Sequence, residues 1–183
     1  MQKKILVLTG SARKEGNSNR MARAFVAAAE AKGHAVKLID TSKLKLNFCH
    51  ACETCYKTGK PCSFDDDFNT IAEDILAADA LVFTSPVYWY SVPSQLKAVI
   101  DKMFSFVVGG KSEQFFGKES ALICCCEEDD PAILDGVRIP FERTSALNQW
   151  TVVGEVLVPG VLAVGDIDKT DGLQRAAALA DMF

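Results

Sequence analysis

Three short runs of consecutive apolar residues stand out along the 183-residue chain, at 4–9, 80–85 and 120–126. Each run is apolar on both faces that a strand presents, which is typical of a parallel sheet covered by helices on both sides. Two further strands are predicted at 35–40 and 152–164. The pattern therefore predicts five strands.

Between these runs, apolar residues recur at the i, i+3, i+4, i+7 spacing of an amphipathic helix. Gly33 stands where a left-handed C-terminal cap is expected, and Asp66 or Asp67 can cap the start of the second helix. Pro93 suits the first turn of the third. The three apolar sets are Met21, Ala24, Phe25 and Ala28; Phe68, Ile71, Ala72 and Ile75; and Leu96, Val99, Ile100 and Met103.

Strands and helices thus alternate along the chain, which predicts an α/β fold with a doubly wound five-stranded parallel sheet. For the strand order 2-1-3-4-5, ligands bind where the order reverses, at the loops that follow strands 1 and 3. No repeat, low-complexity tract or Pro/Ser-rich linker divides the chain, so residues 1–183 are predicted to form a single domain.

Composition narrows the classes of partner. A net charge of −4 and a pI near 5.2, without a basic run, argue against nucleic-acid binding. No segment offers the roughly 18 apolar residues of a membrane span, and the apolar run near the N-terminus is too short for a signal peptide. We therefore expect a cytoplasmic protein without membrane contact. In a reducing compartment, seven cysteines favour metal binding, redox chemistry or core packing over disulfides.

The loop after the first strand reads "GSARKEGNSN", residues 10–19, and leads into the first helix. Helix N-termini carry unpaired N–H groups and a partial positive charge, so this loop can enclose a phosphate. Ser11, Asn17 and Ser18 offer donors, and Arg13 offers a full charge. The alternative is that Asn17 or Ser18 only caps the helix while Arg13 is solvated. The loop lacks the signatures of a P-loop and of a dinucleotide fingerprint.

The loop after the third strand reads "SPVYWYSVPSQLK", residues 85–97, and places Tyr88, Trp89 and Tyr90 in succession. Three adjacent aromatic residues cannot all face the core, so a planar ligand can lie against them. The alternative is that they pack under the next helix or form a subunit contact. A phosphate loop beside an aromatic loop matches the shape of FMN.

"GSARKEGNS" and "SPVYWYSVPSQLKAVIDK" resemble the NADPH-dependent FMN reductase family of flavodoxin-like proteins, with similarity from Lys4 to about Leu122. The resemblance implies a flavodoxin-like fold, FMN as cofactor and NAD(P)H as co-substrate. The residues implied to bind the FMN phosphate are Ser11, Arg13, Asn17, Ser18 and Asn19, and those along the isoalloxazine are Pro86, Val87, Tyr88, Trp89 and Tyr90. Beyond the fourth strand the match weakens, and Cys126 and Glu127 are not included in the predicted site.

The segment "CHACETCYKTGKPC" places Cys49, Cys52, Cys55 and Cys62 within fourteen residues. Three thiolates two residues apart, with a looser fourth, can ligate a [4Fe-4S] cluster. Zinc is the weaker metal because its sites usually use two well-separated cysteine pairs. The run also resembles that of the iron-sulfur flavoprotein branch of the same family. Reduced or adventitiously oxidised thiols remain the alternative. Cys124 to Cys126 end a buried strand and are expected to pack in the core.

Two functions follow as hypotheses. In the first, FMN passes electrons from NAD(P)H to a quinone, a flavin or another small acceptor. In the second, an electron carrier exchanges single electrons between FMN, a [4Fe-4S] cluster and a ferredoxin-like partner. A phospho-signalling domain is excluded because strand 3 ends in "FTSP" without an aspartate.

The placement of two further segments is also predicted from the sequence. The apolar segment 104–116 is expected near the flavin edge, where it suggests a homo-oligomer, a dimer or larger. The cysteine segment is expected at the same edge, because the chain leaves strand 2 there.

Overall fold

The computed structural model describes all residues from 1 to 183, and its five parallel strands form one sheet in the order β2-β1-β3-β4-β5. The bounds are β1 Lys4–Thr9, β2 Ala35–Asp40, β3 Ala80–Pro86, β4 Glu119–Cys125 and β5 Thr151–Val158. The predicted fold class and strand order are confirmed. The predicted fifth strand was too long, because Pro159 lacks a backbone N–H and Gly160 takes a left-handed conformation with a φ of 73°.

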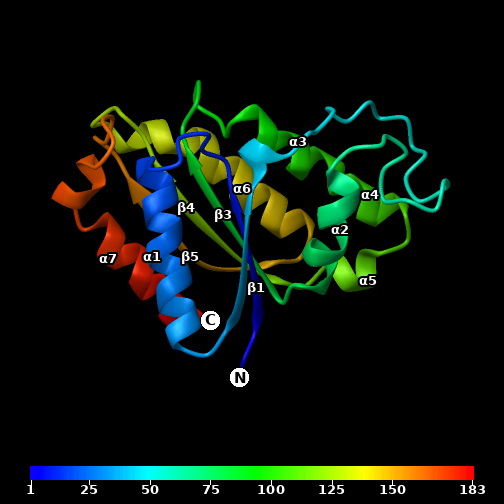
Figure 1. The fold of residues 1–183 in the computed structure, drawn as a ribbon, viewed down its shortest axis with the longest axis horizontal. Coiled ribbons are helices and arrows are strands. Elements are labelled where there is room, and N and C mark those ends of the chain that lie inside the picture. The colour runs from blue at the N-terminus through cyan, green and yellow to red at the C-terminus, as the bar shows by residue number, and fades with distance from the viewer.

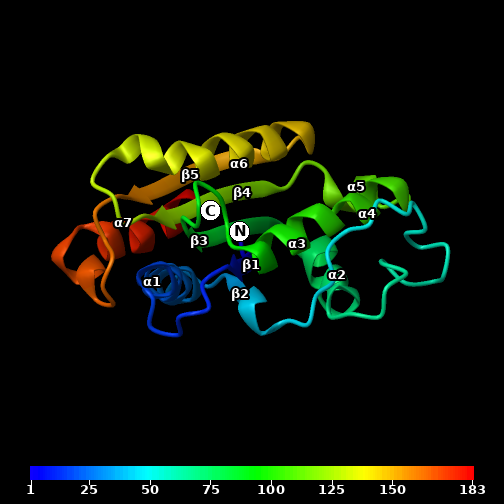
Figure 2. The same cartoon turned by 90° about the horizontal axis from the view of Figure 1, so that it is seen from above.

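Helices cover both faces of the sheet, as Figures 1 and 2 show. They are α1 Asn17–Ala31, α2 Phe68–Ala77, α3 Ser94–Lys102, α4 Phe104–Val108, α5 Ser112–Phe115, α6 Asp135–Leu147 and α7 Gly172–Ala178. Short 3-10 helices lie at η1 Thr41–Lys43, η2 Pro131–Leu134, η3 Asp166–Lys169 and η4 Leu179–Met182. The helices α1 and α7 pack on one face, and α2, α3 and α6 on the other. None is both long and apolar enough to cross a membrane.

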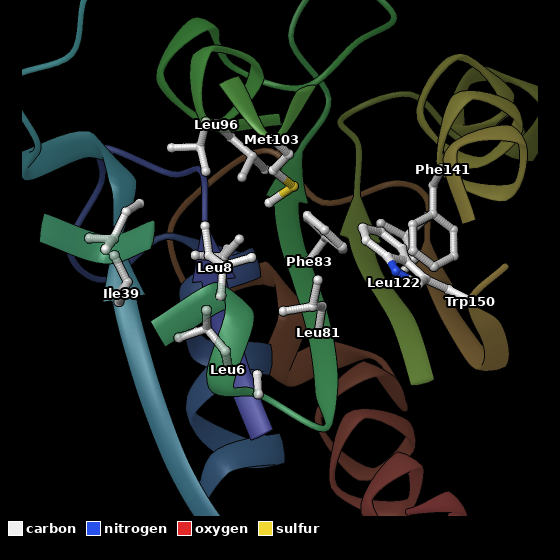
Figure 3. Close-up of a cluster of buried hydrophobic side chains, with 14 of the residues drawn as sticks. Leu6, Leu8, Ile39, Leu81, Phe83, Leu96, Met103, Leu122, Phe141 and Trp150 are labelled. Carbon is white, nitrogen blue, oxygen red and sulfur yellow. The ribbon is translucent and has the colours of Figure 1, made fainter. Parts of the chain in front are cut away.

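The alternation of side chains along each strand divides the core into two layers. In β3, Leu81 and Phe83 pack into the layer beneath α2, α3 and α6, which Figure 3 shows, whereas Ala80 and Val82 pack into the layer beneath α1 and α7. Both layers are apolar, which explains why β1, β3 and β4 read as continuous apolar runs. The rigid sheet holds the loops at its carboxyl edge in place.

Of the expected helix-end residues, Gly33 and Asp66 are found in their roles, whereas Pro93 is the N-cap of α3, one residue before its first turn. Gly33, with a φ of 88°, follows the end of α1. At α2, the Asp66 carboxylate accepts a hydrogen bond from the Phe68 N–H (3.1 Å), while the Asp67 carboxylate accepts one from the Lys45 N–H (2.7 Å). Asp67 therefore joins the chain before the cysteine segment to the chain after it.

The segment 104–116 was expected near the flavin edge, but the structure places it elsewhere. It forms α4 and α5 beside the cysteine segment, at the end of the molecule away from α1 and α7 (Figure 1). Phe106 and Phe115 are buried in the core, so part of its apolar character serves packing. Phe104, Val107 and Val108 stay exposed.

Candidate functional site

Loops from the carboxyl edge of the sheet enclose a cleft of about 460 Å³, which is within the size range of cofactor sites. The structure brings nine of the ten residues predicted to bind FMN to this cleft. They are Ser11, Arg13, Asn17, Ser18, Pro86, Val87, Tyr88, Trp89 and Tyr90. The two loops meet because β1 and β3 are hydrogen-bonded neighbours and end at the same edge. Their contact with a ligand stays a prediction.

The N-terminus of α1 opens onto this cleft. Its N-cap residue is Gly16, which offers no side-chain hydrogen bond to the first turn. A Cβ at Gly16 would lie 2.9 Å from Ser11 Oγ and 3.0 Å from the Arg13 carbonyl oxygen, so only glycine fits the tight loop. The first-turn N–H groups and the helix dipole thus face a polar loop that carries Arg13, which suits an anion.

Two asparagines hold the loop rather than point donors at the cleft. Asn19 Nδ2 donates to the carbonyl oxygens of Ser11 (3.2 Å) and Arg13 (2.9 Å), and Asn19 does not line the cleft. Asn17 Nδ2 donates to the Ala163 carbonyl oxygen (3.0 Å), and Asn17 Oδ1 accepts from the Gly165 N–H (3.1 Å). The loop after β5 is thereby fastened beside the loop after β1.

Residues 88–91 form a tight hairpin that we call the aromatic turn. The Tyr88 N–H donates to the Ser91 carbonyl oxygen (2.8 Å), and the Ser91 N–H donates to the Tyr88 carbonyl oxygen (3.0 Å). Trp89 and Tyr90 both have positive φ, 49° and 61°, as a type I′ turn requires. Such turns favour Asn-Gly, and each bulky residue in this conformation costs about 1 kcal/mol or more.

The aromatic turn exposes its side chains instead of packing them under a helix. Trp89 is 95% exposed, Tyr90 57% and Tyr88 45%. Exposed aromatic side chains on a strained backbone point to a role in contact with another molecule.

The end of β4 and the loops after β4 and β5 complete the cleft with residues that the sequence analysis did not include. They are Cys125, Cys126, Glu127, Glu128, Ile133, Val161, Leu162 and Val164. The edge rule could have found the first four, because Cys125 pairs with Pro86 across the sheet. No sequence signal indicates the others: Ile133 lies in η2 after β4, and Val161, Leu162 and Val164 lie in the loop after β5 that Asn17 contacts. Cys124, Cys125 and Cys126 are buried as expected. Burial raises the pKa of Cys125 to about 12 and also raises the pKa of Cys126, so both thiols stay neutral.

The four cysteines of the segment 49–62 line a separate small cavity of about 20 Å³, which shares no residue with the cleft. All four are free thiols: Cys49 and Cys52 are exposed, Cys55 is half-buried and Cys62 is buried. The donor set suits a thiolate-ligated cluster chemically. No three His, Cys, Asp or Glu side chains are placed to hold a metal ion, however, so the thiols share a cavity without forming a preorganised centre.

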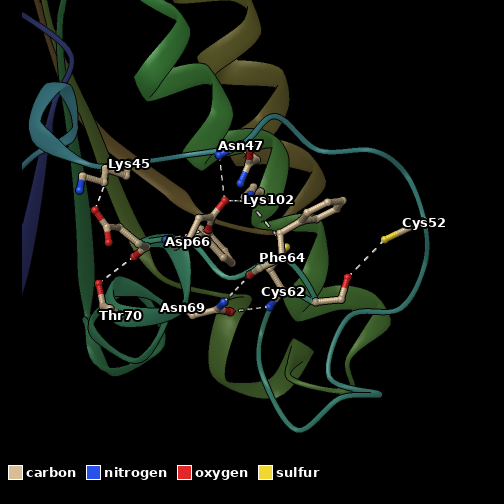
Figure 4. A network of polar contacts seen from close by, with 12 residues as sticks. Lys45, Asn47, Cys52, Cys62, Phe64, Asp66, Asn69, Thr70 and Lys102 are labelled. Carbon is tan, nitrogen blue, oxygen red and sulfur yellow. Dashed lines mark hydrogen bonds and ion pairs between the residues drawn. The ribbon is translucent and has the colours of Figure 1, made fainter.

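A buried ion pair closes the base of the cysteine segment (Figure 4). Lys102, at the end of α3, pairs with Asp66, and their side chains are only 1% and 2% exposed. Lys102 Nζ also lies 3.6 Å from Cys62 Sγ, and the Asp66 carboxylate accepts from the Asn47 N–H (2.8 Å). Burial by itself would raise the pKa of Asp66, but Lys102 and the Asn47 N–H outweigh burial and lower it.

Cys52 lies at the exposed tip of the segment. Its Sγ lies 3.0 Å from Thr54 Oγ1 and 3.7 Å from Ser63 Oγ. The Thr54 hydroxyl, followed by the Thr54 backbone, lowers the pKa of Cys52 to about 7. A substantial fraction of this thiol is therefore ionised near neutral pH, as metal ligation requires.

The cleft and the cysteine cavity are lined from opposite ends of α3 within one chain. The aromatic turn precedes α3, and Lys102 ends it, so about 13 Å of helix separates them at 1.5 Å per residue. The expectation that the cysteine segment adjoins the flavin loops is wrong for a single chain. Leu44 and Leu46 pack on the core layer beneath α2 and α3, and the cysteine segment that follows lies to the side, near α4 (Figure 1).

A family model for "NADPH-dependent FMN reductase" matches residues 3–130. An iron-sulfur flavoprotein of Archaeoglobus fulgidus is 30% identical over 190 residues, which cover 98% of this chain and 80% of that protein. An iron-sulfur flavoprotein of Methanocaldococcus jannaschii is 32% identical over 106 residues, which cover 58% of this chain and about half (54%) of that protein's length.

Solved structures share the fold at lower sequence identity. An azoreductase from Bacillus anthracis superimposes with a TM-score of 0.76 at 21% identity over all of both chains. An NAD(P)H:quinone oxidoreductase from Methanothermobacter marburgensis superimposes with a TM-score of 0.70 at 16% identity, over 100% of this chain and 98% of that one.

Proposed function

Because the chain belongs to the NADPH-dependent FMN reductase family and is an FMN-dependent oxidoreductase, we propose that it transfers electrons from NADH or NADPH to a quinone, a flavin or another small acceptor. The observation that carries this proposal is the single cleft in which the polar loop after β1 meets the aromatic turn. The flavin, when bound, supplies the hydride and single-electron chemistry.

The residues of the cleft divide into two groups by chemistry. Ser11, Arg13, Ser18 and the first turn of α1 would bind the phosphate of FMN through N–H, O–H and guanidinium donors. Pro86, Val87 and the aromatic turn would border the planar ring. Asn17 and Asn19 would position both loops through their contacts with backbone. The direct phosphate contact expected from sequence stays a prediction for Asn17, which lines the cleft, whereas Asn19 does not line it.

Comparison of FMN with riboflavin tests this proposal directly. The two ligands differ only in the phosphate, so quenching of flavin fluorescence should give a dissociation constant about 10- to 100-fold lower for FMN. The FMN-loaded protein should also oxidise NADH or NADPH when a quinone is present. Equal affinities for the two ligands would contradict the phosphate assignment.

A second function is favoured by the four free thiols on one cavity and by relatives named iron-sulfur flavoproteins. We propose as the alternative that Cys49, Cys52, Cys55 and Cys62 ligate a [4Fe-4S] cluster, and that a ferredoxin-like protein is the electron partner. Anaerobic reconstitution should then give about four iron and four sulfide per chain. Cys55→Ala should lose the iron and keep FMN, whereas Cys126→Ser, outside the segment, should keep the iron. Iron contents equal in both variants would contradict ligation by the segment.

We further propose that the protein is a homo-oligomer. Trp89, Leu162 and Val164 are exposed apolar residues around the mouth of the cleft, and Phe104, Val107 and Val108 form a second exposed apolar group. Partner chains that cover these groups would remove apolar surface from water. Light scattering at micromolar concentration should report a dimer or larger, and a monomer would contradict the proposal.

A further inference from the structure

Gly136, the second residue of α6, lies directly against the backbone of the aromatic turn. A Cβ built on Gly136 would lie 1.9 Å from the Tyr90 carbonyl oxygen and 2.8 Å from the Tyr90 carbonyl carbon. Both atoms belong to the main chain, so no side-chain rotation can relieve the overlap. Any larger residue at position 136 must move either α6 or the aromatic turn.

The backbone of Gly136 does not itself require glycine. Gly136 is absent from the glycines with positive φ, and it lies within a 13-residue helix. Glycine is among the poorest helix formers, so helix propensity would favour alanine here. Glycine fits position 136 because the Tyr90 backbone approaches too closely for a side chain.

The aromatic turn needs support from outside because its own conformation is unfavourable. Trp89 and Tyr90 hold left-handed φ values without a glycine, and only the two hydrogen bonds between Tyr88 and Ser91 close the hairpin. Strained conformations persist where the surrounding structure leaves no alternative. The start of α6 is the part of that surrounding structure that contacts the Tyr90 carbonyl.

We propose that Gly136 is a positioning residue, which lets α6 support the aromatic turn in the conformation that forms the wall of the cleft. The functional part of this inference rests on the proposed binding of FMN along the turn. Gly136 does not line the cleft. It acts through the Tyr90 backbone on the placement of Tyr88, Trp89 and Tyr90.

The first test needs no cofactor. Gly136→Ala in the full chain should increase the hydrogen-exchange rates of the Tyr88 and Ser91 amides at least tenfold, as measured by NMR. Gly172→Ala is the matched control, because it adds the same methyl group in the first turn of α7. There the new Cβ meets only side-chain atoms, Ile167 Cδ1 at 2.5 Å and Val158 Cγ2 at 3.0 Å, which can move. Unchanged exchange at Tyr88 and Ser91 in Gly136→Ala would overturn the inference.

The second test is a double-mutant cycle on FMN affinity. Gly136→Ala should weaken FMN binding about tenfold. Tyr90→Gly should also weaken it because it removes a ring from the cleft wall, and it relieves the left-handed φ at position 90, so the turn no longer depends on support from α6. If Gly136 acts through the turn, the double variant should bind within about threefold of Tyr90→Gly. Fully multiplicative losses would overturn the positioning role. If the unaltered protein does not bind FMN, the proposed function is wrong. The exchange experiment would still show whether Gly136 supports the aromatic turn, because it needs no cofactor.

Discussion

The aromatic turn and the cysteine segment are both strained, yet the fold holds them in different ways. Together they contain five of the six non-glycine residues with positive φ: Ala51, Glu53, Tyr56, Trp89 and Tyr90. The aromatic turn leaves the end of a central strand, lies against Gly136 and borders a cleft of about 460 Å³. The cysteine segment is held mainly at its base, by the pair Lys102–Asp66 and the Asp67–Lys45 contact.

This difference indicates how each region would receive a ligand. The cleft already has its shape, so binding there needs little reorganisation. The four thiols line one cavity, but they are not arranged to hold a metal ion. A bound metal group would therefore have to order the segment, and part of its binding free energy would offset the entropy cost of that ordering. Variants that affect one region and leave the other intact test this contrast.

The largest effect is expected at the base of the cysteine segment. Lys102→Met leaves the Asp66 carboxylate buried and unpaired, which should lower the free energy of unfolding by about 3–5 kcal/mol. Urea denaturation would measure the loss. Lys97→Met on the same helix is the matched control: the pair Lys97–Asp101 is 53% and 43% exposed, so its loss should cost about 1 kcal/mol or less. Equal losses of unfolding free energy in the two variants would mean that burial does not raise the cost of breaking the Lys102–Asp66 pair.

The next effect is expected in the cleft. Arg13→Ala should weaken FMN binding by about 1.5–3 kcal/mol, the usual contribution of a hydrogen bond to a charged group, and should leave stability unchanged. Lys14→Ala, one residue further along and outside the cleft, is the control and should have little effect. Flavin fluorescence titration measures both, and an FMN affinity unaffected by Arg13→Ala would make Arg13 a surface charge only.

A smaller effect should reveal the strain in the aromatic turn. Trp89→Gly and Trp89→Ala remove the same exposed ring, but only glycine adopts the φ of 49° without steric cost. We expect Trp89→Gly to be more stable than Trp89→Ala by about 1 kcal/mol in thermal or urea unfolding. Equal stability of the two variants would mean that the turn stores no strain at this residue.

The smallest effect is expected in acid. The lowered pKa of Asp66 means that its ionised form stabilises the fold above its unfolded pKa of about 4, and this contribution is lost as the pH falls through the lower folded value. Urea unfolding at a series of pH values below 4 should show a shallower loss of stability for Asp66→Asn than for the unaltered protein. Parallel curves would show that Asp66 carries no such linkage.

Local pattern alone determined much of the fold and part of the cleft. Runs such as 80–85 predict buried strands because both of their faces are apolar, and the edge rule then places the loops after β1 and β3 side by side. Nine of the ten residues predicted from the pattern and from the family resemblance line one cleft, and their contact with a flavin stays a prediction. The strand order and the meeting of the two loops could be predicted because they depend on residues close in sequence and on a topology with one preferred ligand edge.

Only the tertiary structure decided the remaining features, because each depends on residues that are far apart in the chain. Asn17 fastens a loop 146 residues away, Lys102 meets Asp66 across 36 residues, and Gly136 lies against Tyr90. The path of the cysteine segment follows from the packing of Leu44 and Leu46 on the core rather than from its own pattern. Periodicity reports which face of an element is buried, but it carries no information on which distant partner covers that face.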